Sequence, residues 1–259
     1  MKKKLLKKPI EEPKALNPIT EKILEYKDNT YAFIQSKLIP TIPSNTIVGL
    51  MVPQMKKIAK EAFGDGTALT DKNSNLSVFL NTLPHTYYEE NMVHFYIISQ
   101  INDFELCITT LEKFLPYMDC WPVSDQSTPK VFKRNPKKLL PFAQSWILST
   151  HTYVARFGIR MLMNEFLDKN FKPEYLKWVA SVDKTCYSGD VYLKKMVAWY
   201  FATALAKQYE ATIPYIERHK LTLWTHCTTI KKAVESTRIP EEHKEYIKSF
   251  YSPFIKRKI

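Results

Sequence analysis

The fold of this 259-residue chain is best understood outward from one stretch near its middle, Leu115-Pro116-Tyr117-Met118-Asp119-Cys120-Trp121-Pro122-Val123-Ser124-Asp125. The stretch opens on an aliphatic residue, a proline and an aromatic residue, and then reaches an indole and a carboxylate at a helix start. Trp121 and Asp125 are four residues apart, and side chains at that spacing share one face of a helix. The stretch therefore predicts a helix boundary that presents an acid beside an aromatic ring.

The opening step of this stretch recurs twice later in the chain. Leu140-Pro141-Phe142 and Ile213-Pro214-Tyr215 repeat it, and a tryptophan follows each copy. Helix pairs of about 40–47 residues are the scale of HEAT-type repeats, which bury their apolar faces by stacking on their neighbours. The echo favours an α-solenoid of HEAT-like antiparallel helix pairs with a concave basic groove. An irregular helical bundle is the alternative.

Apolar residues recur at helical spacing along almost the whole chain, and no convincing strand alternation appears. The 16 prolines accompany only 5 glycines, which disfavours tight hairpins and glycine-rich phosphate loops. Residues 64–73 are the one polar stretch long enough for a loop, and Glu89-Glu90 is expected on a solvated helix face. The pattern predicts an all-α fold with helices over residues 18–39, 44–63, 74–82, 86–101, 103–115, 121–132, 136–149, 151–168, 173–183, 189–206, 208–218, 224–237 and 240–256.

The chain is strongly basic, because 38 Lys and Arg against 26 Asp and Glu give a net charge of +12. This excess indicates a polyanionic partner, either nucleic acid or an acidic membrane surface. No apolar run is long enough to cross a membrane, and the basic N-terminus lacks the apolar region of a signal peptide. We therefore expect an intracellular protein, in the cytoplasm or nucleus and not secreted. Residues 1–17 are expected to form a basic flexible tail, and residues 18–259 a single domain.

The cysteines and histidines give no sign of a metal site. The cysteines form no CxxC pair, and no histidine lies at zinc-finger spacing. Reduced, buried thiols are the simplest interpretation of Cys107, Cys120, Cys186 and Cys227. The histidines show no pattern of Ser or Cys partners, so we expect them to be ordinary surface or core residues, with His151 near the start of its helix. We predict neither a metal nor an organic cofactor.

A second indole lies in a run that joins it to positive charge, Lys194-Lys195-Met196-Val197-Ala198-Trp199-Tyr200. A carboxylate beside aromatic faces, in a basic protein, suits a site that stabilises a cation on a nucleic acid. Lys194 and Lys195 are then expected to contact the DNA backbone and to add affinity that depends on salt. The alternative is that both tryptophans belong to the core and that Asp125 caps or solvates a helix.

Several further segments fall in an order that matches one known family: Tyr31-Ala32-Phe33, Gly49-Leu50-Met51-Val52-Pro53, Ile58-Ala59-Lys60-Glu61, the stretch from Phe114 to Trp121, the stretch from Ser149 to Gly158, the stretch from Val197 to Ala204, and the stretch from Lys231 to Ser236. Together they resemble the AlkD family of DNA alkylation repair proteins, which are HEAT-like-repeat DNA glycosylases. The resemblance covers about residues 20–250, so it is global and does not depend on one borrowed motif.

The resemblance implies roles for four residues. Asp125 matches the family's catalytic carboxylate, and Trp121 and Trp199 match its pair of cleft tryptophans. Arg156 matches a cleft arginine near the DNA backbone, and the alternative is that Arg156 pairs with an acid on a neighbouring helix. The implied activity is that of a monofunctional DNA N-glycosylase in base excision repair. Its implied partner is double-stranded DNA containing N3- or N7-alkylated purines, which the family excises without the base flipping that most glycosylases need. We expect the protein to act as a monomer, without a metal and away from membranes.

Two departures from the family pattern bear on activity. Pro122-Val123-Ser124 fills the turn where other small or polar residues are expected, and Cys227-Thr228 replaces an Asn-Lys pair, which would remove a phosphate contact. Some cousins in the wider family bind branched DNA without excising a base. The alternatives are therefore a non-catalytic binder of damaged or branched DNA on the same fold and a HEAT-type protein-interaction scaffold.

Overall fold

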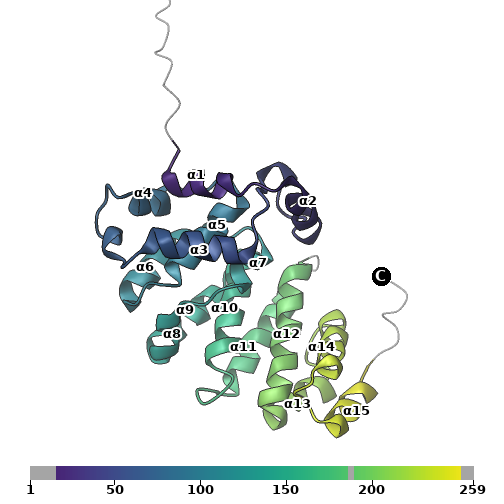
Figure 1. Ribbon diagram of the computed structural model, residues 1–259. Coiled ribbons are helices and arrows are strands. Elements are labelled where there is room, and N and C mark those ends of the chain that lie inside the picture. The colour runs from purple at the N-terminus through teal and green to yellow at the C-terminus, as the bar shows by residue number, and fades with distance from the viewer. Residues whose placement is uncertain (1–15, 186–189, 252–259) are drawn as a thin grey trace, which may run out of the picture.

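The computed structural model describes residues 16–185 and 190–251, and every regular element in these residues is a helix (Figure 1). The all-α prediction is confirmed for this part of the chain. The predicted basic tail lies outside the described residues except for Leu16 and Asn17, and Cys186 lies outside them too. None of the helices in the described ranges is both long enough and apolar enough to cross a membrane.

The first half of the chain is organised around one buried helix, α5 (Tyr88–Ile98), which packs on α3 (Val52–Phe63). All residues of α5 are buried, because neighbouring helices cover it on every side. The other elements of this half are α1 (Pro18–Glu25), α2 (Asn29–Leu38), α4 (Asn75–Asn81), α6 (Phe104–Phe114) and α7 (Trp121–Asp125), with the short 3₁₀ turns η1 (Ser44–Thr46), η2 (Thr67–Leu69) and η3 (Leu115–Tyr117). η2 falls inside the stretch that was predicted to be a loop.

The second half contains three helices that are successive neighbours: α10 (Thr152–Glu165), α12 (Val191–Lys207) and α14 (Leu223–Glu235). α10 packs on α12, and α12 packs on α14. A second set packs against these three: α9 (Pro136–Ile147) on α10, and both α11 (Glu174–Thr185) and α13 (Tyr209–Glu217) on α12. The short α8 (Lys130–Arg134) precedes α9, and α15 (Glu241–Ser249) packs on α14 (Figure 1).

The helix predicted over residues 18–39 is wrong at its centre, because the chain breaks there into α1 and α2. Asp28 causes the second helix to start: its carboxylate accepts hydrogen bonds from the backbone N–H groups of Thr30 and Tyr31, both at 2.9 Å. An N-cap of this kind satisfies donors that the first turn of a helix leaves unpaired. Continuous apolar spacing concealed the break, since the cap depends on a single polar residue.

The helix predicted over residues 44–63 is wrong in its first half: α3 begins only at Val52, and residues 47–50 form no regular element. Gly49 has a φ of 99°, and a Cβ at this position would lie 2.1 Å from the backbone oxygen of Asp28. Only glycine fits such a close approach at positive φ. The predicted helix over 121–132 also divides, into α7 and α8, and Pro129 stands directly before α8.

The prediction that Glu89 and Glu90 lie on a solvated face is wrong, because both side chains are buried. The Glu89 carboxylate accepts hydrogen bonds from the backbone N–H groups of Val48 at 2.9 Å, Gly49 at 2.7 Å and Leu50 at 3.3 Å. Burial nevertheless raises the pKa of Glu89 above its ordinary value. The buried Glu89 carboxylate thus fixes, by hydrogen bonds, the non-helical segment that interrupts the predicted helix.

Candidate active site

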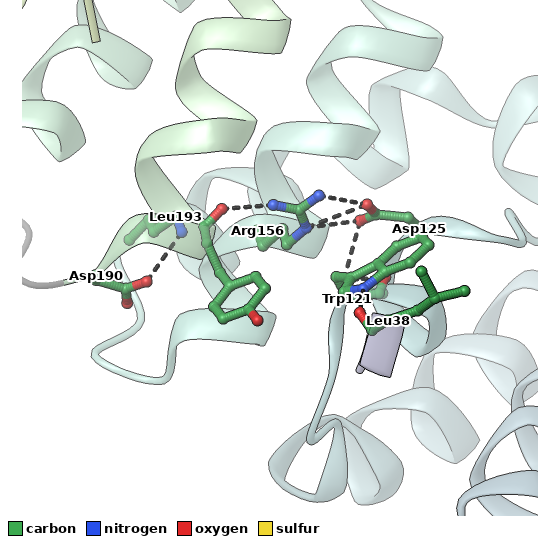
Figure 2. Close-up of polar contacts among 8 residues, drawn as sticks. Leu38, Trp121, Asp125, Arg156, Asp190 and Leu193 are labelled. Carbon is green, nitrogen blue, oxygen red and sulfur yellow. Dashed lines mark hydrogen bonds and ion pairs between the residues drawn. The ribbon is translucent and has the colours of Figure 1, made fainter. Parts of the chain in front are cut away.

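The short helix α7 carries both the indole of Trp121 and the carboxylate of Asp125. Pro122 lies in its first turn, where proline's fixed φ favours helix initiation. The indole N–H of half-buried Trp121 donates to the backbone carbonyl of Leu38 at 3.1 Å (Figure 2). This bond ties α7 to the end of α2, across 83 residues of sequence.

Asp125 is buried, with 7% of its surface exposed, and its carboxylate is paired with Arg156 of α10. The Arg156 Nε lies 2.9 Å from Oδ1 and 3.2 Å from Oδ2, and Nη2 lies 2.5 Å from Oδ2 (Figure 2). The hydroxyl of Ser124 donates to Oδ1 at 3.0 Å. A bidentate pair of this geometry fixes the orientation of both groups. The resemblance implied a DNA contact for Arg156. The alternative interpretation, an ion pair with an acid on a neighbouring helix, is the contact that the structure shows.

The guanidinium of Arg156 also joins α10 to the start of α12. Its Nη1 donates to the backbone carbonyl of Tyr192 at 2.5 Å. Asp190 caps α12 by accepting from the N–H of Leu193 at 2.9 Å, and its other oxygen accepts from the hydroxyl of Thr152 at the start of α10. The N-terminal ends of α10 and α12 are therefore held together at the site, as Figure 2 shows for Arg156, Asp190 and Leu193.

Trp199 is half-buried on α12 and lies against Arg160, which is one turn after Arg156 on α10. The Arg160 guanidinium carbon lies 5.5 Å from the centroid of the Trp199 ring, within the range of cation–π attraction. Burial lowers the pKa of Arg160, the negative charge of Asp125 raises it, and the positive charge of Arg156 lowers it. Arg160 is thus within electrostatic reach of the pair. Sequence reasoning missed Arg160, although its place four residues after Arg156 puts both on one face of α10.

The two lysines that were predicted to contact DNA lie near this site on α12. Lys195 is exposed, and its ammonium lies 5.7 Å from the centroid of the Tyr192 ring. Lys194 is half-buried one residue earlier. The structure thus brings Asp125 and Arg156 into direct contact. It places Trp121 on the same helix as Asp125. Trp199 and Lys195 lie on α12, the helix whose Tyr192 carbonyl accepts a hydrogen bond from Arg156. The roles of these residues toward DNA stay predictions.

His151 and three of the cysteines have structural positions in the described residues. His151 is the N-cap of α10, with its Nδ1 accepting from the N–H of Val154 at 3.4 Å, so its predicted place at a helix start is confirmed. Cys107, Cys120 and Cys227 are buried, as predicted for these three side chains. In residues 16–185 and 190–251, no group of three or more His, Cys, Asp or Glu side chains is arranged to hold a metal ion.

Comparison with known proteins gives one family assignment. The family model described as DNA alkylation repair enzyme matches residues 26–237. This span runs from the end of α1 to just beyond α14, and it contains α7, α10 and α12 with their site residues. A sequence comparison with curated proteins finds no match.

Proposed function

Because this chain belongs to the DNA alkylation repair enzyme family, we propose that it is a monofunctional DNA glycosylase that excises N3- and N7-alkylated purines from double-stranded DNA. Family membership confirms the resemblance to AlkD-like repair proteins. The observation that carries the finer proposal is the buried Asp125 carboxylate, which Arg156 holds in a fixed orientation beside Trp121. A repair role places the protein with the cell's DNA, in the cytoplasm or nucleus, and it acts as a monomer.

The proposed chemistry follows from the charge of the damaged base. Alkylation at N7 of guanine or N3 of adenine makes the base cationic, so the base leaves with the glycosidic electron pair as a neutral molecule. Positive charge then develops on the sugar, as in other glycosidic cleavages. A carboxylate near C1′ stabilises this charge and accepts a proton from the water that adds there. Asp125 takes this role in the proposal.

Arg156 acts in this scheme chiefly as a positioning residue for Asp125. A guanidinium has five N–H donors, and three of those of Arg156 are used by Asp125 and Tyr192. The other two have no hydrogen-bond partner in the described residues, and the side chain is buried. Lys194 and Lys195, on the same end of α12, add salt-dependent contacts to the backbone.

The two tryptophans supply indole faces from α7, which carries Asp125, and from α12, whose Tyr192 carbonyl accepts from Arg156. Trp121 precedes Asp125 by one helical turn, and Trp199 stands two turns beyond Tyr192 on α12. Attraction between a cationic base or sugar and an indole face contributes about 0.5–2 kcal/mol per ring. These contacts strengthen as charge develops on the sugar, so they favour the transition state over the bound ground state.

We extend the proposal to an α-solenoid with a concave basic groove along α10, α12 and α14. The support is the neighbour relation of these helices together with the spacing of their accessible residues. Tyr192, Lys195 and Trp199 follow one face of α12, while Arg160 and Lys232 lie on the adjoining helices. Repeats place equivalent helices side by side, so residues distant in sequence line a common face.

The decisive test is release of a free base. We expect the purified protein to liberate N7-methylguanine from a duplex that carries this base once, and to leave an abasic site with both strands intact. The same duplex with unmodified guanine is the control. No release by excess protein over many hours, from DNA that the protein demonstrably binds, would contradict the proposal.

One observation favours a second function, that of a non-catalytic DNA-structure binder. Both oxygens of the Asp125 carboxylate already accept hydrogen bonds, from Arg156 and from Ser124. A carboxylate that is hydrogen-bonded in this way has a purely structural role if it does not contact the sugar of the DNA. Tight binding to four-way junction DNA without release of any base would establish this alternative.

A further inference from the structure

Two arginines lie one turn apart on α10, and only one of them is committed to protein partners. Arg156 is buried against Asp125 and the carbonyl of Tyr192. Arg160 makes no hydrogen bond or ion pair with any residue that the structure describes, and its Nε is buried without a partner. An unpaired buried N–H is costly, and a charged group more so. The Nε–H of Arg160 lacks an acceptor, while the charge of Asp125 and the ring of Trp199 favour the charged guanidinium.

Arg160 borders an open cavity of about 410 Å³, which is also lined by Trp199, Thr203, Lys207 and Arg238. A second cavity of about 210 Å³ adjoins it, because Trp199, Thr203 and Arg238 line both. The second cavity adds Lys232 of α14. The Lys207 ammonium already pairs with Asp168 at 2.7 Å, so Arg160, Arg238 and Lys232 are the cations left to meet a ligand.

Two carboxylates also line these cavities. Their negative charge disfavours an anion at the end of the cavities where they lie. Glu165 is the last residue of α10 and Glu235 the last of α14. Burial raises the pKa of Glu165 above its ordinary value. Arg160 precedes Glu165 by more than one helical turn and lies over the ring of Trp199. The favourable position for an anion is therefore at the Arg160 and Trp199 end.

We propose that Arg160 binds a phosphodiester of the DNA backbone, in a subsite walled by Trp199 and completed by Arg238. The inference rests on the proposed function, because it requires DNA to lie along α10 and α12. A guanidinium presents its donors as a planar fork that matches two phosphate oxygens. The ring of Trp199 holds this fork in place, and the Thr203 hydroxyl lies in the same cavity as a further donor. Arg160 thus contributes affinity for the DNA backbone, while Arg156 keeps Asp125 in position.

The test measures equilibrium binding to an undamaged duplex over a series of salt concentrations. Each phosphate contact contributes about 0.9 to the slope of log K against log salt. We expect Arg160→Gln to weaken binding roughly tenfold and to make this slope shallower by about 0.9. Arg160→Lys should restore most of the slope because it keeps the charge. Arg134→Gln is the matched control, since exposed Arg134 bonds only the Asn102 side chain at 3.0 Å, and it should leave the slope unchanged.

The outcomes separate this proposal from the proposed function. A wild-type slope in well-folded Arg160→Gln overturns the subsite, whatever the protein does to alkylated DNA. If Arg160→Gln loses thermal stability, Arg238→Gln carries the test, because Arg238 is exposed and its removal should leave the fold intact. An unchanged slope there also overturns the subsite. Wild-type protein that fails to bind duplex DNA refutes both proposals. A protein that binds DNA through Arg160 but releases no base refutes only the glycosylase.

Discussion

At the scale of single residues, the buried pair of Asp125 and Arg156 dominates the site. Two charges that leave water together are stable only when their geometry is good, and removal of either partner leaves the other uncompensated. Here the pair has bidentate geometry. The Ser124 hydroxyl also donates to the carboxylate, and the Tyr192 carbonyl also accepts from the guanidinium. The same contacts that position a catalytic carboxylate therefore also stabilise the packing of α7 on α10.

The role of Trp199 can be measured separately from that of the ion pair. In Trp199→Leu we expect single-turnover excision of N7-methylguanine to fall roughly 3- to 30-fold, the equivalent of about 0.5–2 kcal/mol of lost cation–π attraction. Trp178→Leu on α11 is the matched control, because this half-buried indole packs on Tyr175, with ring centroids 5.0 Å apart. It should lower stability and leave the excision rate unchanged. Equal rates in wild type and Trp199→Leu would exclude Trp199 from the site.

Two histidines outside the site make stability depend on pH. The His85 Nε2 and His94 Nδ1 lie 2.8 Å apart, and burial lowers the pKa of His85 to about 4 and that of His94 well below its ordinary value. A depressed pKa means that the unfolded chain takes up the proton first, so stability is fully present above pH 6.5 and is lost as pH falls toward 4.

For this reason we expect the free energy of unfolding to fall by about 3 kcal/mol over that range from His85 alone. Urea unfolding at several pH values checks this, with His85→Phe expected to show a smaller fall. His243→Phe on α15 is the control and should follow the wild type. If the free energy of unfolding fell equally with pH in wild type and His85→Phe, the proposed role of His85 would be wrong.

At the scale of elements, the helices with regular apolar spacing and clear start signals were predicted closely. The helix expected over 136–149 is α9 at Pro136–Ile147, and that expected over 189–206 is α12 at Val191–Lys207. The errors lie where a contact distant in sequence decides the backbone. Glu89 accepts from residues about 40 positions earlier, and no local pattern announces such a bond.

Gly49 and Gly64 provide a matched test of that interruption, because both have positive φ but differ in their surroundings. A Cβ at Gly49 would lie 2.1 Å from the Asp28 oxygen and 2.8 Å from the Ala32 nitrogen, whereas a Cβ at Gly64 meets nothing within 4 Å. We expect Gly64→Ala to cost about 1 kcal/mol of stability. Gly49→Ala should cost about 3 kcal/mol or more, because backbone must move. Thermal unfolding compares them, and equal melting temperatures would show that residues 47–50 are not constrained as described.

At the scale of the whole molecule, the site is assembled from segments that no local pattern connects. The spacing of Trp121 and Asp125 predicts that they share one face, but only the packing of α7 on α10 brings Arg156 to the carboxylate. Arg160 was missed because its importance comes from the neighbouring helix that carries Trp199. The family resemblance supplied the site candidates, and the structure added how two of them are paired.

The central claim is that Asp125 stabilises positive charge on the sugar, and one measurement tests it most directly. Single-turnover release of N7-methylguanine is compared in wild type, Asp125→Asn and Asp168→Asn, together with the affinities of wild type and Asp125→Asn for undamaged duplex. Asp168 is the control for the excision rate, since its side chain is exposed and pairs with Lys207, outside the Asp125–Arg156 pair. Its affinity is not compared, because Asp168→Asn frees Lys207 beside the cavity that Arg160 lines. Because Asp125→Asn leaves Arg156 without its counter-charge, we expect about 3 kcal/mol of lost stability, and rates are taken well below its melting temperature.

We expect Asp125→Asn to bind DNA as the wild type does and to release the base roughly 10²–10³-fold more slowly. Asp168→Asn should keep the wild-type rate. A folded Asp125→Asn protein that excises at the wild-type rate would contradict the account, because the charge of Asp125 would then play no part in the reaction.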